Sequence, residues 1–307
     1  MNDVLIVAGG TDRQVDIWSV TRPVESKRLD ATHANCIVFS EDKMLFYVGG
    51  YKLIQCFKRD SQDPIIRWNA HEGNILCLLS YQDNMLFSGA EDKKFIVWKP
   101  LNFQMGKSGQ IFAHQFNSEV SSMTLDPTDI RTLFLSFQNG EIARYTLGSD
   151  TITIIKRPGP MVRSISSTRN LNFLFAADNE GFVYVYQTQT GELIKRFRAH
   201  DTYINKCVLS YDGMRLATCS SDHTAQVWSV PSLTNVSSTP ELRWKHPMVH
   251  KRWVWDCVFT QDGKSLVTVS SDRSVTQFFE QSPIQRTLFE RQRAAMCLAL
   301  AEIDAIH

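Results

Sequence analysis

Several features are scarce in this sequence of 307 residues, and each scarcity argues against a class of function. Lys and Arg number 33 against 32 Asp and Glu, so the net charge of +1 lacks the basic excess typical of nucleic-acid binders. No apolar run approaches the ~20 residues of a membrane-spanning helix, and the start, with Asp3 and only a short apolar run, does not resemble a signal peptide. We therefore expect no nucleic-acid binding and no membrane insertion. We expect the protein in the cytoplasm, with the nucleus and endomembrane surfaces reached through partners as alternatives.

Motifs for disulfides and metals are missing as well. The cysteines are odd in number and form no CxxC pair: Cys36, Cys56, Cys77, Cys207, Cys219, Cys257 and Cys297. Most of them sit inside apolar, strand-like runs, which favours buried free thiols in a reducing compartment. Their spacing predicts no zinc site, and we expect neither a metal nor a cofactor.

Helical periodicity is also lacking, and a repeat of about forty residues takes its place. An aromatic residue ends each predicted third strand, at intervals of 39 to 50 residues: Trp18, Phe57, Trp98, Tyr145, Tyr186, Trp228 and Phe278. Units of this length with four short strands are typical of β-propeller blades. We predict an all-β fold, a single seven-bladed propeller spanning residues 1–307. Its first to seventh repeats cover residues 3–31 with 294–304, 32–69, 70–113, 114–157, 158–199, 200–249 and 250–293.

Both ends of the chain enter the prediction. The first repeat begins at its second strand, and Ala294–Leu300 is expected to supply the missing first strand. That pairing would close the ring and remove an exposed sheet edge. Turn residues such as Asp83-Asn84 and Asp212-Gly213 mark strand reversals. The polar insertion at 231–249 is interpreted as a long connection to an outer strand near Leu242–Trp244.

A polar set recurs in the repeats: His before the first strand, Ser or Thr in the second, Asp in the following turn and Trp in the third. The members are His71, Ser88, Asp92 and Trp98; His200, Thr218, Asp222 and Trp228; and His250, Thr268 and Asp272, with Phe278 at the last position. We expect a buried network in which each donor finds a partner. A catalytic triad would not recur in this way, and its hydroxyl would lie beneath an indole, so we predict no enzyme.

This spacing resembles the WD40 repeat family along nearly the whole chain. Leu216–Asp222 with Val227-Trp228, and Arg252–Phe259 followed by Val267–Asp272, are similar to the G-protein-β-like WD40 subunit of TOR kinase complexes, and so is the start at Val4–Trp18. In that family a tryptophan–hydrophobe–tryptophan run also opens the last full blade, whereas Phe278-Phe279 here replaces the usual Trp.

The resemblance implies a divergent, non-catalytic scaffold, a monomeric propeller within a larger complex. It implies docking on the catalytic domain of a TOR-type kinase, whose active-site region the subunit stabilises, beside companion subunits. The alternative is a generic WD40 scaffold of another cytosolic or nuclear complex. Blade ends with Trp-Asp-x-Arg, frequent in ubiquitin-ligase receptors, are absent from the sequence.

Trp253 and Trp255 give the most specific hint of a binding surface. They alternate with Val254, so both indoles are expected on one side of the first strand of the seventh repeat, at the top rim. Aromatic residues, Met and Arg at such a rim are typical of interface hot spots. An alternative buries Trp255 between the sixth and seventh repeats. With the equivalent positions of other repeats, the predicted partner-binding residues are Trp253, Trp255, Tyr203, Asn205, Met161, Arg163, Leu76, Asn74 and Met296.

Overall fold

A computed structural model describes most of the chain, and its regular structure is nearly all β-strand. The described residues are 3–19, 27–31, 33–82, 85–100, 109–126, 129–149, 151–156, 159–168, 172–244, 247–291 and 294–303. They fall into two compact units, residues 1–120 with 291–307 and residues 121–290, which are described in turn. Across these ranges no helix has the length and apolar character needed to cross a membrane. The predicted turn Asp83-Asn84 lies outside the described residues.

The first unit contains two antiparallel sheets. One has the strand order β27-β1-β2-β3 and the other the order β10-β9-β8-β7-β6-β5-β4. Their strands are β1 (Asp3–Gly10), β2 (Gln14–Ser19), β3 (Lys27–Asp30), β4 (Cys36–Phe39), β5 (Leu45–Gly49), β6 (Tyr51–Lys58), β7 (Pro64–Tyr81), β8 (Met85–Ala90), β9 (Lys94–Trp98), β10 (Gln110–Gln115) and β27 (Ala295–Ile303).

Strand β7 explains why the second sheet has seven strands. Its first half pairs with β6, from Phe57↔Pro64 to Leu53↔Asn69, and its second half pairs with β8, from Ile75↔Ala90 onward. The outer strand of the second repeat therefore continues without a break into the first strand of the third repeat. The predicted boundary between residues 69 and 70 falls inside this strand.

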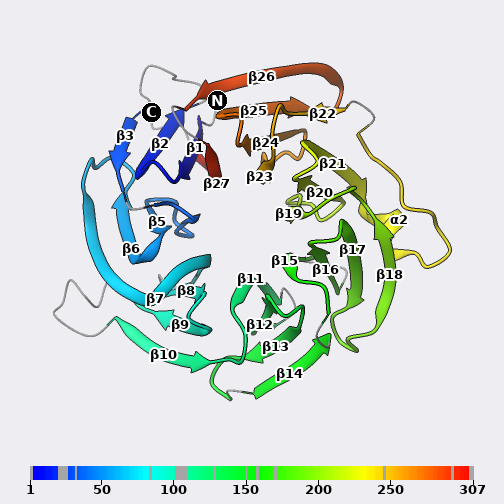
Figure 1. The fold of residues 1–307 in the computed structure, drawn as a ribbon, viewed down its shortest axis with the longest axis horizontal. Helices are drawn as coiled ribbons and strands as arrows, with labels where there is room; N and C mark the ends of the chain where they lie inside the picture. Colours follow the sequence, from blue (N-terminus) through cyan, green and yellow to red (C-terminus); the bar gives the residue numbers. More distant parts are fainter. Residues whose placement is uncertain are drawn as a thin grey trace. The chain divides into compact units, whose positions relative to one another are not determined.

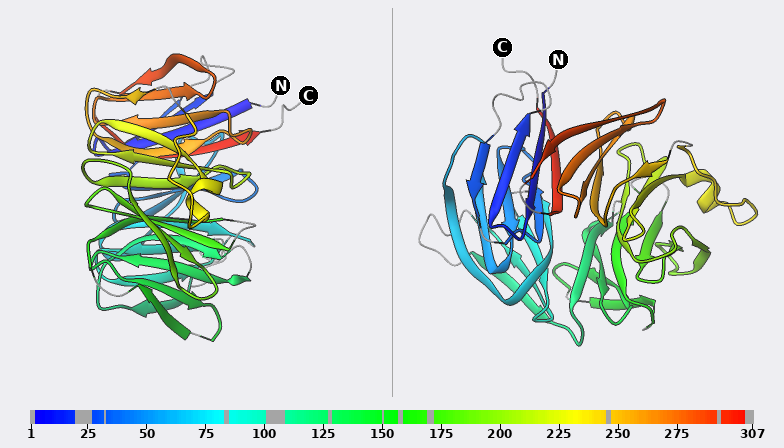
Figure 2. Two further views of the ribbon diagram at one scale, coloured as in Figure 1. Left: turned by 90° about the vertical axis from the view of Figure 1, so that its right-hand side faces the viewer. Right: turned by 45° about the horizontal axis from the view of Figure 1, so that its top comes forward.

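Strand β27 comes from the other end of the chain and pairs antiparallel with β1. The register runs from Asp3↔Ile303 to Gly10↔Ala295. Figures 1 and 2 show the two strands, blue and dark red, side by side in every view. The segment expected to supply the first strand of the first repeat thus forms that pairing.

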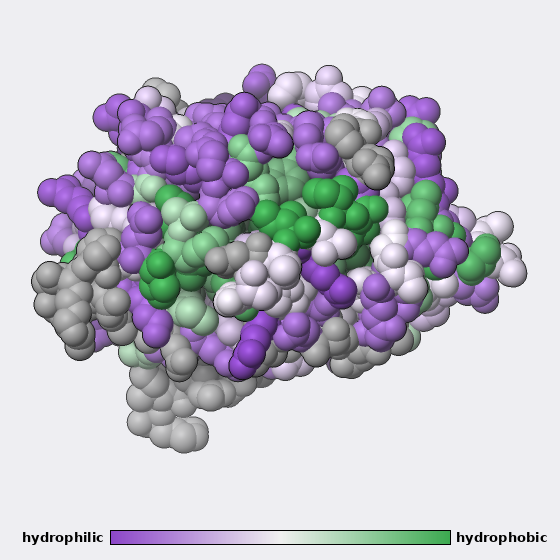
Figure 3. Space-filling view, turned by 90° about the horizontal axis from the view of Figure 1, so that it is seen from below, coloured by the Kyte–Doolittle hydropathy of each residue, from purple (hydrophilic) through white to green (hydrophobic). Residues whose placement is uncertain are grey.

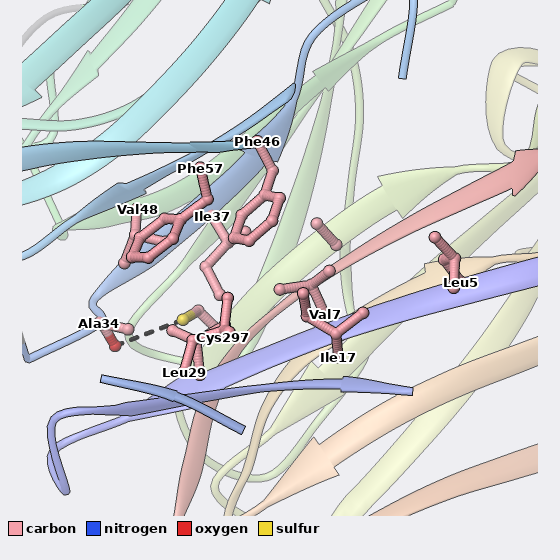
Figure 4. Close-up of a cluster of buried hydrophobic side chains, with 12 residues drawn as sticks. Leu5, Val7, Ile17, Leu29, Ala34, Ile37, Phe46, Val48, Phe57 and Cys297 are labelled. Carbon is pink, nitrogen blue, oxygen red and sulfur yellow. Dashed lines mark hydrogen bonds between the residues drawn. The ribbon is translucent and has the colours of Figure 1, made fainter. Parts of the chain in front are cut away.

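Buried apolar side chains from both sheets form the core of the first unit. Leu5, Val7 and Ile17 pack with Phe46 and Phe57, and Cys297 and Ala299 bring β27 into the same cluster (Figure 4). The rings of Phe46 and Phe57 stack with centroids 5.2 Å apart. Close packing also explains Gly49, where an added Cβ would lie 2.7 Å from Sγ of Cys36.

The second unit contains four antiparallel sheets, each of four strands. In chain order they are formed by β11–β14, β15–β18, β19–β22 and β23–β26. The strands are β11 (Val120–Asp126), β12 (Asp129–Phe137), β13 (Ile142–Thr146), β14 (Thr151–Lys156), β15 (Val162–Ser167), β16 (Phe173–Asp178), β17 (Phe182–Gln187), β18 (Leu193–Arg198), β19 (Ile204–Leu209), β20 (Arg215–Ser220), β21 (Thr224–Ser229), β22 (Met248–Val249), β23 (Val254–Phe259), β24 (Ser265–Ser270), β25 (Ser274–Phe279) and β26 (Ser282–Glu290).

The insertion in the sixth repeat differs from the sequence prediction. It begins with a short helix, α2 (Val230–Thr234). The outer strand is β22, which pairs with β21 at only two positions, and Leu242 forms a single bridge to Trp228. The insertion is instead fastened by the ammonium of Lys195, which donates at 2.6–2.8 Å to the carbonyls of Ser232, Asn235 and Ser238.

The aromatic residues that define the repeat all lie in the third strands and are buried, from 0% to 7% exposed. Apolar side chains also reach the surface, as the green areas among purple in Figure 3 show. Large exposed apolar side chains include Tyr51, Tyr203, Tyr211, Val236 and Trp253. Of these, Tyr203 and Trp253 immediately precede β19 and β23, so they lie at the same end of two neighbouring strands.

Candidate partner-binding surface

The third repeat contains the polar set in full. Nδ1 of His71 lies 3.0 Å from the carboxylate of Asp92, and Nε2 lies 2.7 Å from Oγ of Ser88. Nε1 of Trp98 donates to the same hydroxyl oxygen at 2.8 Å. A ring protonated on Nδ1 donates to Asp92 and accepts the Ser88 proton on Nε2, so the side chains of this network satisfy one another.

The sixth and seventh repeats repeat the arrangement with threonine. His200 lies 2.8 Å from Asp222 and 2.8 Å from Thr218, to which the indole of Trp228 donates at 3.1 Å. In the seventh repeat His250 lies 3.1 Å from Asp272 and 2.7 Å from Thr268. Phe278 has no N–H to donate, and its ring meets that of His250 edge-on at 5.6 Å.

Burial sets the charge state of these groups. It lowers the pKa of His71 and of His250, and the neighbouring carboxylates only partly oppose it. Burial also acts to raise the pKa of Asp272, but hydrogen bonds from Ser274 and Lys251 outweigh it and hold that pKa at about 2. Neutral imidazoles beside ionised carboxylates follow, which is the state that the hydrogen bonds require.

These networks leave little room for chemistry. Both ring nitrogens of each histidine are engaged, and the hydroxyls of Ser88 and Thr218 each contact both an imidazole and an indole N–H. A nucleophile needs access to substrate, and these hydroxyls are fully buried. Among the residues that the structure describes, no group of three or more His, Cys, Asp or Glu is arranged to hold a metal ion.

The first repeat has a buried network that the sequence analysis missed. Arg291 stands four residues before the first residue of β27, at the spacing of His200 before β19 and of His250 before β23. His71 lies inside β7, four residues before Ile75, where the pairing of β7 with β8 begins. Its guanidinium donates to Oδ1 of Asp12 at 2.8 Å, to the carbonyl of Gln14 at 2.8 Å and to the carbonyl of Ala8. Arginine thus takes the histidine position in a repeat where Ala8 replaces the hydroxyl residue.

His114 shows the opposite case. Like His71 and His200 it follows an alanine, and it stands at the first position of the predicted fourth repeat, but it lies inside β10 and pairs with Phe95. Its ring meets that of Phe116 edge-on at 4.6 Å. Spacing distinguishes it from the network histidines. His114 stands six positions before the start of β11, whereas His200 and His250 stand four positions before the strands that follow them.

A β-bulge marks the predicted rim positions. In the first strands of five repeats the register slips by one, leaving a single extra residue on that strand. Bulges re-aim a side chain and recur beside functional sites. The extra residues are Leu76, Arg163, Asn205, Trp255 and Met296.

The alternation predicted for Trp253 and Trp255 holds only in part. Strand β23 begins at Val254, so Trp253 precedes it, and the bulge at Trp255 interrupts the regular alternation. The two indoles nevertheless meet edge to face, with centroids 5.6 Å apart. Trp253 is 47% exposed, whereas Trp255 is half-buried and donates from Nε1 to Oγ of Ser271 at 2.6 Å.

In the second unit, contacts link the rim residues of three neighbouring strands. The guanidinium of Arg163 lies over the ring of Tyr203 at 5.4 Å, which joins β15 to β19. Nδ2 of Asn205 donates to the carbonyl of Val254 at 2.8 Å, which joins β19 to β23. Met161 is half-buried at the same end, where its carbonyl accepts from Asn179. Arg163, Tyr203, Asn205, Trp253 and Trp255 therefore form one connected surface, which we call the second-unit rim.

The predicted rim residues of the first unit have different surroundings. Asn74 is held by Glu91, whose Oε2 accepts from its side-chain nitrogen at 2.9 Å. Its own Oδ1 accepts from Asn35 at 3.4 Å. Leu76 and Met296 are half-buried.

Thiols of the first unit connect successive repeats; Cys77 and Cys297 are buried, and Cys36 is half-buried. Sγ of Cys297 lies 3.3 Å from the carbonyl of Ala34, Sγ of Cys36 lies 3.8 Å from that of Ile75, and Sγ of Cys77 lies 3.7 Å from that of Val120. Each acceptor stands at the inner strand of the following repeat. All seven cysteines are free.

The strand pattern and the recurring His–Asp networks define the class of fold: the chain has a β-propeller fold and contains WD40 repeats. The family described as "WD domain, G-beta repeat" matches residues 62–99, 191–229 and 245–278, which include the aspartates and third-strand aromatics of the three His–Asp networks. Among solved structures, the WD40 β-propeller domain of Doa1 superposes with a TM-score of 0.73. At 19% identity, that match covers 91% of this chain and 90% of that one.

Curated relatives narrow the class further. The chain is 28% identical over 240 residues to "Target of rapamycin complex subunit LST8" of Saccharomyces cerevisiae, covering 74% of this chain and 77% of that protein. It is also 28% identical over 246 residues to "Target of rapamycin complex subunit wat1" of Schizosaccharomyces pombe, covering 76% of each. The chain thus resembles the WD40 subunits of TOR complexes as a divergent relative, which confirms the resemblance found in the sequence.

Proposed function

We propose that the protein is a non-catalytic subunit of a TOR-type kinase complex. It binds the catalytic region of the kinase through one face of the propeller and stabilises that region. The relatives named as target of rapamycin complex subunits, which match about three quarters of the chain, support this assignment. So does the chemistry of the networks, whose histidines, carboxylates and hydroxyls are occupied with one another.

The second-unit rim is the proposed contact surface. The observation that carries it is the continuity from Arg163 through Tyr203 and Asn205 to the tryptophan pair. Aromatic and arginine side chains contribute most of the binding energy at protein interfaces, and here neighbouring strands hold them in place. In the first unit, Asn74, Leu76 and Met296 are proposed as further contacts of the same kind.

The architecture that we propose for this subunit is a ring of seven blades closed by β27. The pairing of β27 with β1 supports closure, because it completes a four-stranded set from the two ends of the chain. Removal of the last fifteen or so residues is expected to lower the melting temperature sharply. A truncated protein with unchanged thermal stability would contradict the closure.

We also propose that one copy of the chain works in the cytoplasm within a larger complex. Seven free cysteines, six of them buried, support a reducing compartment. Imaging of the tagged protein, together with its size on a calibrated column, tests both points. A secreted protein or a homo-oligomer would contradict them.

Affinity purification of the tagged chain, followed by mass spectrometry, tests the main proposal. The unmodified chain is expected to retain a TOR-type kinase, and the double variant Trp253→Ala, Trp255→Ala is expected to lose it. The matched control is Tyr211→Ala, because Tyr211 is 59% exposed in the turn between β19 and β20, away from the bulges. Circular dichroism establishes that the double variant is folded.

Two outcomes would overturn parts of the proposal. If the folded double variant retains the kinase, the contact surface is misplaced. If the unmodified chain retains other proteins but no TOR-type kinase, the protein is a WD40 scaffold of another complex.

A further inference from the structure

The exposed end of the seventh repeat combines an aromatic side chain with three cations. Lys251 and Arg252 precede Trp253, and Arg273 lies in the turn between β24 and β25; all three cations are exposed. Backbone contacts hold the two loops together, since the amide of Lys251 donates to Asp272 at 3.0 Å and that of Ser271 donates to the carbonyl of Trp253 at 2.9 Å. The cations therefore lie around one end of one blade.

No ion pair neutralises these three cations in the part of the chain that the structure describes. The nearby carboxylate of Asp272 is occupied by His250 and Ser274 and by the backbone of Lys251. Within the described part of the chain, no ion pair involves Lys251, Arg252 or Arg273. Other arginines of the same unit do have acidic partners: Arg198 faces Asp201, and Arg215 faces Asp212 and Glu280.

Trp253 provides a fixed apolar surface beside this charge. Its ring meets Trp255 edge to face, and Trp255 is anchored through Ser271. The residue is 47% exposed, so part of the indole remains accessible to a partner. An indole held in place loses little conformational entropy when a partner covers it.

We propose that this end of the seventh repeat binds an acidic segment of a protein partner. An apolar side chain of the segment lies on Trp253, and its flanking carboxylates face Lys251, Arg252 and Arg273. The inference deepens the proposed function and rests on it, because it states the chemistry of the kinase segment that the rim accepts. Charge complementarity would add specificity and speed to an association anchored by the aromatic pair.

A protein segment fits this surface better than the other anionic macromolecules. Nucleic-acid binding needs a wider basic surface, and the whole chain carries a net charge of only +1. A membrane would take an apolar side chain free to insert among lipids, whereas the Trp253 ring is packed against its neighbour. A carboxylate-rich peptide needs only a few cations around one apolar contact.

Peptide binding to the full-length protein tests the proposal directly. The probe is a synthetic peptide of about twelve residues with Leu-Phe between runs of Glu and Asp. The control peptide has Lys in place of every Glu and Asp. Tryptophan fluorescence follows the titration. The acidic peptide is expected to bind, more weakly as salt is raised, and the Lys peptide is not.

Two charge-reversed variants distinguish an effect at the proposed site from an effect of the net charge of the protein. In Lys251→Glu, Arg252→Glu, Arg273→Glu the affinity for the acidic peptide is expected to fall about tenfold or more. The control Arg131→Glu, Lys264→Glu, Arg286→Glu changes three exposed cations of the same unit, and it is expected to bind as the unmodified protein does. Trp253→Ala is expected to weaken binding without changing its salt dependence.

Several outcomes would overturn the proposal: no binding of the acidic peptide, equal binding by the two triple variants, or charge-dependent binding of oligouridylate or phosphatidylserine vesicles in place of the peptide. Co-purification of the kinase separates this inference from the proposed function. If the triple variant retains the kinase while Trp253→Ala, Trp255→Ala loses it, the subunit assignment stands and the acidic segment is wrong. If the unmodified protein retains no TOR-type kinase, the assignment falls, and the peptide titration still decides whether the surface accepts acidic segments.

Discussion

Arg291 and Asp12 lie 279 residues apart in the sequence, and a hydrogen bond of 2.8 Å joins them inside the first unit. The side chain of Arg291 is fully buried and also reaches the carbonyls of Ala8 and Gln14. Hydrogen bonds between charged groups are stronger than neutral ones, and the protein shields this one from solvent. The guanidinium thus holds the segment that leads into β27 against the turn between β1 and β2.

Replacing Arg291 with Ala is expected to lower the free energy of unfolding by roughly 3–5 kcal/mol, because it leaves the carboxylate of Asp12, whose side chain is only 10% exposed, without its counter-charge. Urea denaturation measures the loss. The matched control is Arg28→Ala, since Arg28 bonds Asp16 at 2.7 Å but its side chain is 43% exposed. That variant is expected to lose less than about 1 kcal/mol. Equal losses in the two variants would contradict a special role for Arg291.

The networks of the sixth and seventh repeats provide a matched pair of substitutions. Thr218→Val removes the partner of both His200 and Trp228, whereas Thr268→Val removes only that of His250, because Phe278 has no N–H. Each unpaired buried group costs about 1–3 kcal/mol. Thr218→Val is therefore expected to destabilise the protein by at least about 1 kcal/mol more than Thr268→Val. Thermal and urea unfolding of the two variants measure the difference, and equal values would show that the indole does not depend on the hydroxyl.

The repeat could be predicted from the sequence because its signals are local. Ser or Thr, Asp and Trp stand four and six residues apart, within one hairpin whose geometry fixes their contacts, and the same interval recurs with buried aromatics. The role of Arg291 could not be predicted in the same way, because arginine here occupies the position that histidine has in the other networks. Its spacing gains meaning only once the first residue of β27 is known. The continuity of β7 across the boundary between two repeats could not be predicted either, because the strand runs unbroken through that boundary.

The rim was harder to predict because it depends on backbone irregularity. Strict alternation places Trp253 and Trp255 on one face, but a bulge is an added residue with no characteristic side chain, as Leu76, Arg163 and Asn205 show. The contact between Arg163 and Tyr203 joins strands of different repeats, at a distance that no local pattern encodes. The pairing of charge with Trp253 also depends on Arg273, which reaches the same end from another turn.

Stability is expected to fall as the pH falls below neutrality. Burial lowers the pKa of His71 and His250 in the folded protein, whereas histidines of the unfolded chain have pKa values near 6.5. On acidification the unfolded chain therefore binds protons before the folded protein does, which favours unfolding. Stabilisation is therefore complete above about pH 7 and declines through the range near 6.5. A second loss follows between about pH 4 and pH 2, because the folded pKa of Asp272 is about 2 and unfolded aspartates titrate near 4.

Urea denaturation at a series of pH values between about 7.5 and 5 measures the first loss. The double variant His71→Asn, His250→Asn serves as the control. It is expected to be less stable but to show a flatter dependence on pH in this range. A steeper dependence in the variant, or stability that rises on acidification of the unmodified protein, would contradict the assignment of neutral, buried imidazoles.

Thiol reactivity tests the burial of the cysteines, some of which contact backbone carbonyls of the next repeat. Burial raises the pKa of Cys56 and of Cys207 to about 12, so almost no thiolate exists there at neutral pH. Six of the cysteines are buried, and Cys36 is the one with intermediate exposure. Brief treatment of the native protein with iodoacetamide, followed by peptide mass spectrometry, is therefore expected to label Cys36 first and to leave Cys56 and Cys207 unmodified.

The same reagent in concentrated urea is expected to label all seven positions, which establishes that each peptide is detectable. The comparison within one molecule is more informative than a total rate, because Cys36 and Cys77 bond equivalent carbonyls in successive repeats and differ mainly in exposure. If Cys77 reacts as fast as Cys36, exposure does not govern access, and the sheet that carries both opens as a unit. If Cys36 alone reacts, the strands around Cys77 and Cys297 stay closed on the timescale of alkylation, as their hydrogen bonds to neighbouring repeats require.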